Sequence, residues 1–446
     1  PPPAGSRVSH PRRAIRRNPN GSTLTAPRRC RTPATTLANR ANERMSHLIE
    51  AGSAASRLQY LGESVRAPLV AALAGNSIDR DDARRLIDVT DEAEVAALLA
   101  VAGAVRTRHK GTTVTYSPKA FLPITNLCRD RCAYCTFRAD ADAPNAWTML
   151  PEEIRHTSDG ARQLGCGEAL MCLGDKPEQA YRAHRATLAA LGCATTIEYV
   201  ARASEIALEA GLLPHTNAGV LSRDEMRLLR RTNVSLGLML ENVSPRLRGK
   251  GEAHYYAPDK DPALRLAMIE AACELRIPFT AVILLGIGET STERVDSLLA
   301  IRAVHERHGH IQEIIVQNFR AKPTTRWAAR PEPESVVMAK TIAVTRLLMP
   351  TMNVQAPPNL SPYDHRLFLQ SGINDWGGIS PLTPDFVNPE APWPHVATLT
   401  DTCRAEGFEL QPRLPVYASF LAAPDFVDPA LRDAAERCAE RIGAHL

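Results

Sequence analysis

The sequence predicts a (β/α)8 barrel of TIM type, with a helical lead-in before it and closing helices after it. After Thr115, short apolar runs alternate with helical segments of ten to fifteen residues, which is typical of βα units around a parallel sheet. Eight candidate strands can be recognised. Polar residues follow most of them directly, at the strand ends where (β/α)8 barrels build their active sites.

The lead-in comes first, and four regions are expected in chain order: 1–44, 45–115, 116–384 and 385–446. Residues 45–115 show Ala and Leu at helical spacing, so we expect helices there. Residues 1–44 are rich in Arg and Pro without apolar periodicity. We interpret them as a disordered or non-native extension, with Met45 as a natural start; a transit-type peptide is the alternative.

The barrel strands are expected where apolar runs are bounded by turn residues. Helices between them carry their own start signals: Ser222 with Glu225 and Thr290 with Glu293 form capping boxes, and Asp261 stands as an N-cap before a proline. After residue 384 a Pro-rich loop precedes closing helices. The eight predicted strands are 120–125, 168–173, 212–217, 235–240, 279–285, 311–317, 353–355 and 373–376.

Composition limits the functions that the chain can have. The net charge is +4, but ten Arg and one Glu lie in residues 1–44, so the remainder is mildly acidic. It lacks the basic face that nucleic-acid binding requires. No apolar run approaches the roughly 20 residues of a membrane span, and ten cysteines in a chain this long suit a reducing cytosol. We therefore expect a cytoplasmic protein without nucleic-acid or membrane partners.

Three cysteines form the most specific motif. Cys128, Cys132 and Cys135 follow the first predicted barrel strand with three and then two residues between them. A closed iron–sulfur cubane needs four thiolates, so three would hold a cluster with one iron free. The alternatives are three buried cysteines or a zinc site. A zinc site would borrow a fourth ligand from Cys166, Cys172 or Cys193.

This Cys-x3-Cys-x2-Cys motif, with Tyr134 before its last cysteine, resembles the radical S-adenosylmethionine (SAM) superfamily. The resemblance implies a radical SAM barrel with a 4Fe-4S cluster and S-adenosyl-L-methionine as cofactors. It implies that the cofactor contacts come from Tyr134, Gly174, Asp175, Glu241, Gly286 and Gly288. A salt-bridged structural acid is the alternative for Glu241, and a structural turn is the alternative for the two last glycines.

A longer set of motifs is similar to one family within that superfamily, the 7,8-didemethyl-8-hydroxy-5-deazariboflavin (FO) synthases of coenzyme F420 biosynthesis. The matching segments are 128–137, 173–178, 211–215, 258–262, 309–313, 316–322, 355–360 and 375–378. The resemblance implies a radical SAM lyase. It would cyclise the 5-amino-5-(4-hydroxybenzyl)-6-(D-ribitylimino)-5,6-dihydrouracil adduct to the deazaflavin, with loss of ammonia.

The same resemblance implies a separate or fused hydroxybenzyl-transferring radical SAM module, and an electron donor of flavodoxin or ferredoxin type. The uracil and ribityl groups of the substrate need polar partners. Our candidates are Gln317, Asn318, Lys322, Gln355, Asn359 and Asp375. No proton-transfer residue stands out.

Some positions depart from the pattern that we expect of the family. Val282 stands in place of a Gly and Ala218 in place of a Pro. These departures leave room for a paralogue with a shifted substrate. Two other functions also remain open. One is a sister radical SAM enzyme of menaquinone or biotin type, and the other is a non-catalytic iron–sulfur protein.

Overall fold

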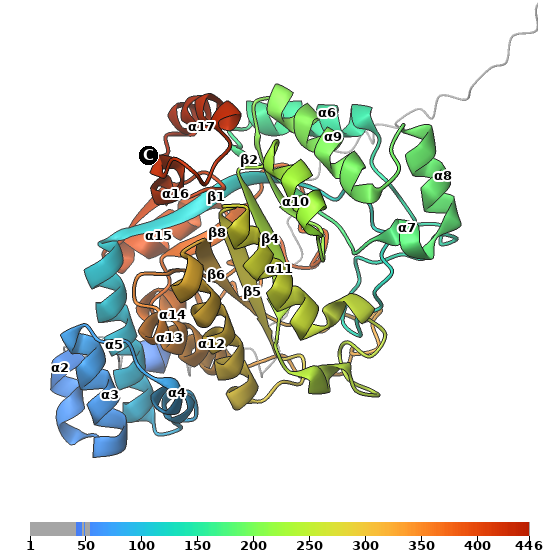
Figure 1. Ribbon diagram of the computed structural model, residues 1–446. Helices are drawn as coiled ribbons and strands as arrows, with labels where there is room; N and C mark the ends of the chain where they lie inside the picture. Colours follow the sequence, from blue (N-terminus) through green and yellow to red (C-terminus); the bar gives the residue numbers. More distant parts are fainter. Residues whose placement is uncertain (1–41, 47–48, 50–53, 446) are drawn as a thin grey trace, which may run out of the picture.

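The architecture is a closed parallel barrel surrounded by helices (Figure 1). The computed structural model describes residues 42–46, 49 and 54–445. Strands follow one another around the barrel in chain order from β2 to β8, and β1 pairs with both β8 and β2. The predicted (β/α)8 fold is confirmed. Its strands are β1 (Thr113–Leu122), β2 (Glu168–Cys172), β3 (Leu213–Asn217), β4 (Ser235–Glu241), β5 (Phe279–Leu285), β6 (Ile311–Asn318), β7 (Asn353–Gln355) and β8 (Asp375–Ile379).

Two predicted strands are displaced and one strand was missed. β1 begins at Thr113, seven residues before the predicted start at Ala120. The first part of the strand, which pairs with β8, was missed because its residues are mostly polar and only partly buried. The last strand, predicted at 373–376, begins two residues later, since β8 runs from Asp375 to Ile379 and includes both following glycines. A ninth strand, β9 (Glu409–Pro412), pairs only with β1 outside the barrel, and its residues are not apolar enough to reveal it.

Helices cover the outside of the barrel (Figure 1). The capping boxes predicted at Ser222 and Thr290 and the N-cap predicted at Asp261 are all formed. The α-helices are α2 (Ala54–Arg57), α3 (Glu63–Ala74), α4 (Arg80–Ile87), α5 (Glu92–Lys110), α6 (Pro151–Gln163), α7 (Pro177–Ala180), α8 (Arg182–Ala190), α9 (Thr196–Glu209), α10 (Arg223–Arg230), α11 (Pro262–Glu274), α12 (Ser291–His308), α13 (Ser335–Leu348), α14 (His365–Gln370), α15 (Val396–Ala405), α16 (Ala418–Ala422) and α17 (Pro429–Ile442). Three short 3-10 helices are η1 (Leu58–Tyr60), η2 (Pro245–Arg248) and η3 (Pro258–Lys260).

The lead-in helices pack against one side of the barrel. Helices α4 and α5 contact α12 and α13 of the barrel, so the lead-in shares the main hydrophobic core. The prediction for residues 1–44 lies, except for 42–44, outside the described residues. None of the helices within 42–46, 49 and 54–445 has the length and apolar character to cross a membrane.

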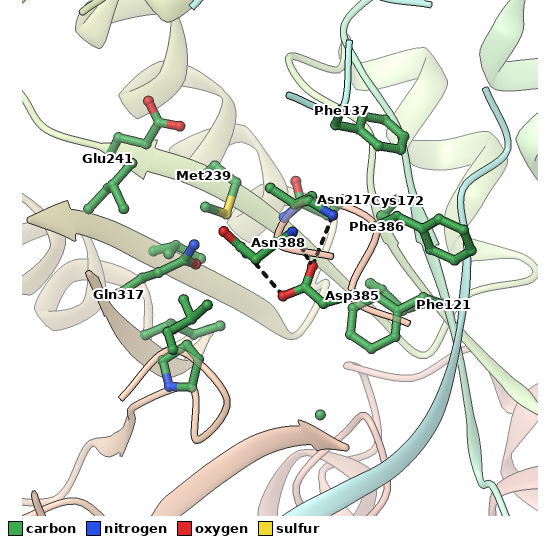
Figure 2. A pocket seen from close by; sticks show the side chains of 18 of the residues that line it. Phe121, Phe137, Cys172, Asn217, Met239, Glu241, Gln317, Asp385, Phe386 and Asn388 are labelled. Atoms are coloured by element: carbon green, nitrogen blue, oxygen red, sulfur yellow. Dashed lines mark hydrogen bonds between the residues drawn. The ribbon is translucent and has the colours of Figure 1, made fainter. Parts of the chain in front are cut away.

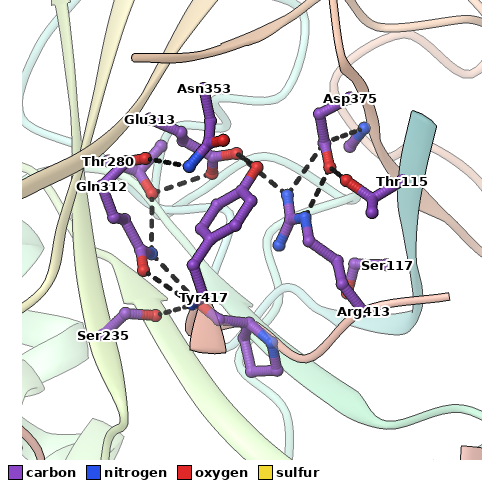
Figure 3. A network of polar contacts seen from close by, with 12 residues as sticks. Thr115, Ser117, Ser235, Thr280, Gln312, Glu313, Asn353, Asp375, Arg413 and Tyr417 are labelled. Atoms are coloured by element: carbon purple, nitrogen blue, oxygen red, sulfur yellow. Dashed lines mark hydrogen bonds and ion pairs between the residues drawn. The ribbon is translucent and has the colours of Figure 1, made fainter. Parts of the chain in front are cut away.

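The segment after β9 closes the lower end of the barrel, where the strands begin (Figure 3). Arg413 donates to Asp375 and Glu313, and Tyr417 donates to Glu313 at 3.0 Å. The carbonyl of Pro415 accepts hydrogen bonds from Ser235 and Gln312. The open end of the barrel is therefore the opposite one, at the carboxyl ends of the strands.

Candidate active site

A cavity of about 320 Å³ runs from the carboxyl ends of the strands deep into the barrel (Figure 2). This barrel cavity is within the usual size range of small-molecule sites. All three motif cysteines line it, as do residues of β1 to β8 and of the loop 385–388. The cavity therefore lies at the end of the barrel where the sequence predicts the active site.

The loop 128–135 is held in place by backbone contacts. Its Arg131 and Ala133 amides donate to the carbonyls of Tyr256 and Ala253 at 2.9 and 2.8 Å. The amide of Asp175 donates to the Cys128 sulfur at 3.1 Å. A Cβ on Gly174 would lie only 2.6 Å from that sulfur, so a glycine is required beside Cys128.

The donor set fits an iron–sulfur cluster better than a single zinc ion. Zn–S bonds of about 2.3 Å would place tetrahedral thiolates roughly 4 Å apart, whereas the thiolates of a cubane bind different irons. Among the described residues, the cysteines do not form a group whose ligand atoms all lie within 4.8 Å of one another. Burial and the Asp130 carboxylate raise the pKa of Cys128 to about 12, so binding a metal there releases a proton.

Three buried carboxylates lie together at the cysteine loop, and one of them, Asp130, belongs to it. Ligand oxygens of Asp130, Asp175 and Asp259 lie within 4.8 Å of one another. Arg129 pairs with Asp259, and Asp175 accepts from the Val220 amide at 2.8 Å. Burial and the neighbouring Asp259 raise the pKa of Asp175 to about 7. Asp175, predicted to contact the cofactor, lines the barrel cavity with Gly174.

Glu241 ends β4 at the rim of the same cavity and is an ion-paired acid. Its carboxylate lies 2.6 Å from Lys260 and 2.7 Å from His254. Burial opposes its ionisation, but the charge of Lys260 and the contacts with His254 outweigh burial and lower the pKa of Glu241. Tyr134 contacts the same histidine, with its hydroxyl 3.0 Å from Nε2. Tyr134 and Glu241, two of the six residues predicted to contact the cofactor, thus both line the cavity and are connected through His254.

Gly286 and Gly288 form a turn that does not line the barrel cavity. Both have positive φ angles, of 92° and 99°. The Gly286 amide donates to Glu289 at 2.9 Å, and a Cβ there would meet Pro333 at 2.7 Å. The turn and its packing require both glycines, and their contact with the cofactor stays a prediction.

Five of the six predicted substrate residues line the cavity: Gln317, Asn318, Lys322, Gln355 and Asn359. The sixth, Asp375, is fully buried outside it and binds Arg413 and Thr115. It was misplaced because the glycines after it suggested a loop. Those glycines belong to the strand, where Gly377 leaves room for Gln355 and Gly378 for Lys119.

Several lining residues were missed from the sequence. Asp385 and Asn388 come from the loop after β8 and hydrogen bond to each other at 3.0 Å (Figure 2). Lys119, Glu168 and His215 lie inside strands, away from the loops on which the prediction was based. For Glu168 and His215 the available signal was a titratable residue beside apolar strand residues, since buried charges are rare without a partner. Lys119 lies among polar residues and gave no such signal.

Comparison with known proteins agrees with this geometry. Residues 122–301 match the model of the Radical SAM superfamily. The chain is 44% identical over 329 residues to the 7,8-didemethyl-8-hydroxy-5-deazariboflavin synthase of Methanothermobacter thermautotrophicus, covering 74% of this chain and 99% of that protein. It is 42% identical to the FO synthase of Nocardia farcinica over 398 residues, covering 86% of this chain but only 44% of the relative.

The fold is also found among solved structures. Methylornithine synthase superposes with a TM-score of 0.61 at 18% identity, covering 78% of this chain and 97% of that one. At this identity the match concerns the fold alone. The cysteine motif, the barrel and the match over 99% of the length of the Methanothermobacter enzyme together place the chain in a single family. The chain belongs to the 7,8-didemethyl-8-hydroxy-5-deazariboflavin synthases, a family of radical SAM enzymes.

Proposed function

We propose that this chain closes the third ring of the deazaflavin, converting the hydroxybenzyl-ribitylaminouracil adduct to 7,8-didemethyl-8-hydroxy-5-deazariboflavin with release of ammonia. The observation that carries this proposal is the 44% identity over 99% of the length of a relative with that name. The cavity of about 320 Å³, with three cysteines at its mouth and amide side chains along its walls, supports it.

Cys128, Cys132 and Cys135 would hold the 4Fe-4S cluster, which when bound supplies the electron that cleaves SAM to a carbon radical. The side chains of the protein would bind and orient the cofactor. Tyr134 and Glu241 line the cavity beside the cysteine loop, where the cofactor would lie. The nearby Gly174 leaves the Cys128 side chain the space it needs.

The substrate would lie deeper in the cavity than the cofactor. Gln317, Asn318, Lys322, Gln355 and Asn359 offer hydrogen-bond donors and acceptors for uracil and ribityl groups. The closed lower end of the barrel, plugged by Arg413 and Tyr417, keeps bulk water away from the reacting carbons.

Two partners complete the proposal. The Nocardia relative is more than twice as long as the region it shares with this chain. We infer that the hydroxybenzyl-transferring module works as a separate or fused unit. A one-electron donor of flavodoxin or ferredoxin type would reduce the cluster.

The test is anaerobic turnover. The chain is reconstituted with iron and sulfide, reduced, and given SAM and the adduct; 5′-deoxyadenosine and fluorescent deazaflavin are measured together. The proposal expects both products. A Cys132→Ala variant should form neither and lose iron, while a Cys193→Ser control, altered at a half-buried cysteine outside the cavity, should form both. Deoxyadenosine without deazaflavin from the unaltered chain would contradict the substrate assignment.

A further inference from the structure

The deep end of the barrel cavity carries a polar floor. Five cavity-lining residues define this floor: Lys119, Glu168, His215, Thr280 and Glu313. Four of them lie in the first three residues of their strands, and Lys119 of β1 pairs in register with Glu168, the first residue of β2. Lys119 donates to Glu168 at 2.9 Å, and Thr280 donates to Glu313 at 2.9 Å. The network of Figure 3 supports the floor from below through Arg413 and Ser235.

An apolar band lies above this floor. Two residues further along, the cavity-lining side chains of four of these five strands are apolar, and only β3 has a polar one, Asn217. The four apolar side chains are Phe121, Leu170, Val282 and Ile315. Two residues of a strand span about 6.6 Å, so the band is about as tall as one aromatic ring. Two residues beyond the band, the cavity-lining residue of β6 is the polar Gln317, and Glu241 lines the cavity at the end of β4.

His215 has one hydrogen-bond acceptor, Nε2, that no described residue uses. Its Nδ1 lies 2.6 Å from the Ser235 hydroxyl, which donates its only hydrogen to the Pro415 carbonyl at 2.7 Å. Nδ1 must therefore carry the proton and donate to Ser235. In the neutral ring, Nε2 is then an acceptor. No described residue hydrogen bonds to it.

The ring is neutral at physiological pH. Burial, together with the charges of Lys119 and Arg413, lowers the pKa of His215 to about 4, although Glu168 opposes the shift. Gly237 keeps Nε2 uncovered, because a Cβ at that position would lie 2.9 Å from it. Gly378 similarly leaves space for Lys119, whose Cε lies 1.9 Å from where a Cβ would be.

We propose that the floor binds the phenolic hydroxyl of the substrate's 4-hydroxybenzyl group, with His215 Nε2 accepting its hydrogen and the Lys119 ammonium donating to its oxygen. The aromatic ring lies in the apolar band. A ribityl chain carries a hydroxyl on every carbon except the one bonded to nitrogen and would leave several facing apolar side chains, so its place is the polar upper part of the cavity. This inference rests on the proposed function, which supplies the substrate.

The test compares the adduct with an analogue that carries benzyl in place of 4-hydroxybenzyl. Dissociation constants and kcat/KM are measured for both with the reconstituted chain. Since a site that hydrogen bonds a hydroxyl leaves buried groups unpaired with an analogue lacking it, the unaltered chain should prefer the adduct about tenfold or more. His215→Asn retains a group at Nδ1 but none at Nε2, so its preference should fall close to onefold. His215→Gln, with an amide near Nε2, should recover part of it.

Two further variants separate binding from folding. Gly237→Ala covers Nε2 without changing the histidine and should also erase the preference. His310→Asn removes another fully buried histidine, one that bonds the Ile269 carbonyl outside the cavity. It should keep the preference even if its melting temperature falls.

The outcomes distinguish this inference from the proposed function. Deazaflavin formed by the unaltered chain without preference for the hydroxyl, or an equal loss for both compounds in His215→Asn, overturns the floor assignment alone. Failure of the unaltered chain to bind either compound overturns both proposals.

Discussion

At the scale of single residues, Glu241 shows how this site tolerates a buried charge. The residue is 3% exposed and adopts a left-handed backbone with φ of 65°, which costs a non-glycine residue about 1 kcal/mol or more. Its compensation is electrostatic, since Lys260 and His254 contact the carboxylate from η3 and the loop before it. The rim of β4 is thereby linked to the segment that pairs with the cysteine loop.

Replacing this acid should therefore cost much more than replacing an exposed one. Glu241→Gln leaves the Lys260 ammonium, whose side chain is 11% exposed, without its counter-charge. We expect the free energy of unfolding to fall by about 3 kcal/mol in urea titrations. Glu274→Gln, which breaks an exposed pair with Arg223, should change it by less than about 1 kcal/mol. Equal effects of the two variants would show that Glu241 is not an electrostatic anchor.

The sequence identified the cysteine site because spacing alone defines it. Three thiols within eight residues must lie close together in any fold. His215 and Lys119 could not be found in this way. Their partners, Ser235 and Glu168, belong to other strands, and the glycines that make room for them lie further along the chain. A site of this kind forms only when the strands come together in the barrel, and a local sequence pattern does not contain that information.

At the scale of elements, helix ends were predictable and contacts between helices were not. Capping boxes involve residues three apart, so Ser222 and Thr290 could be assigned from the sequence. A glycine inside a helix gives no such information. It costs about 1 kcal/mol relative to alanine, and only the tertiary contact shows whether that cost is compensated.

Alanine substitutions at two helical glycines are expected to have opposite effects on stability. A Cβ on Gly103 of α5 would lie 2.7 Å from the backbone oxygen of Gln370 in α14. A Cβ on Gly160 of α6 would lie 3.4 Å from a Leu382 methyl group, which can move. We expect Gly103→Ala to destabilise by about 1–3 kcal/mol and Gly160→Ala to be neutral or stabilising by up to about 1 kcal/mol. Thermal unfolding of both variants would check this, and a stabilised Gly103→Ala would refute the close contact.

At the scale of the whole molecule, the chain after the barrel closes its lower end. Strand β9 pairs with the lower half of β1, and this pairing brings Arg413 under the barrel. A barrel was predictable from eight βα units, but this plug was not. Its strand is polar, and its function depends on two acids, Glu313 and Asp375, that are distant in sequence.

Arg413 should therefore be one of the most sensitive positions for stability. Its side chain is 9% exposed and pairs with Asp375 and Glu313, which are 0% and 6% exposed. Arg413→Met would leave two buried carboxylates without a counter-charge, and we expect a loss of about 3–5 kcal/mol in urea unfolding.

The source of that loss can be isolated with a second substitution. Adding Asp375→Asn to Arg413→Met removes one of the uncompensated charges, so the double variant should be more stable than Arg413→Met alone, even though Asp375→Asn by itself destabilises. Arg404→Met, in an exposed pair with Asp401, controls for loss of an arginine and should change stability by less than about 1 kcal/mol. If the double variant is the least stable of all, packing rather than charge holds the plug, because only unpaired carboxylates can be relieved by neutralising one of them.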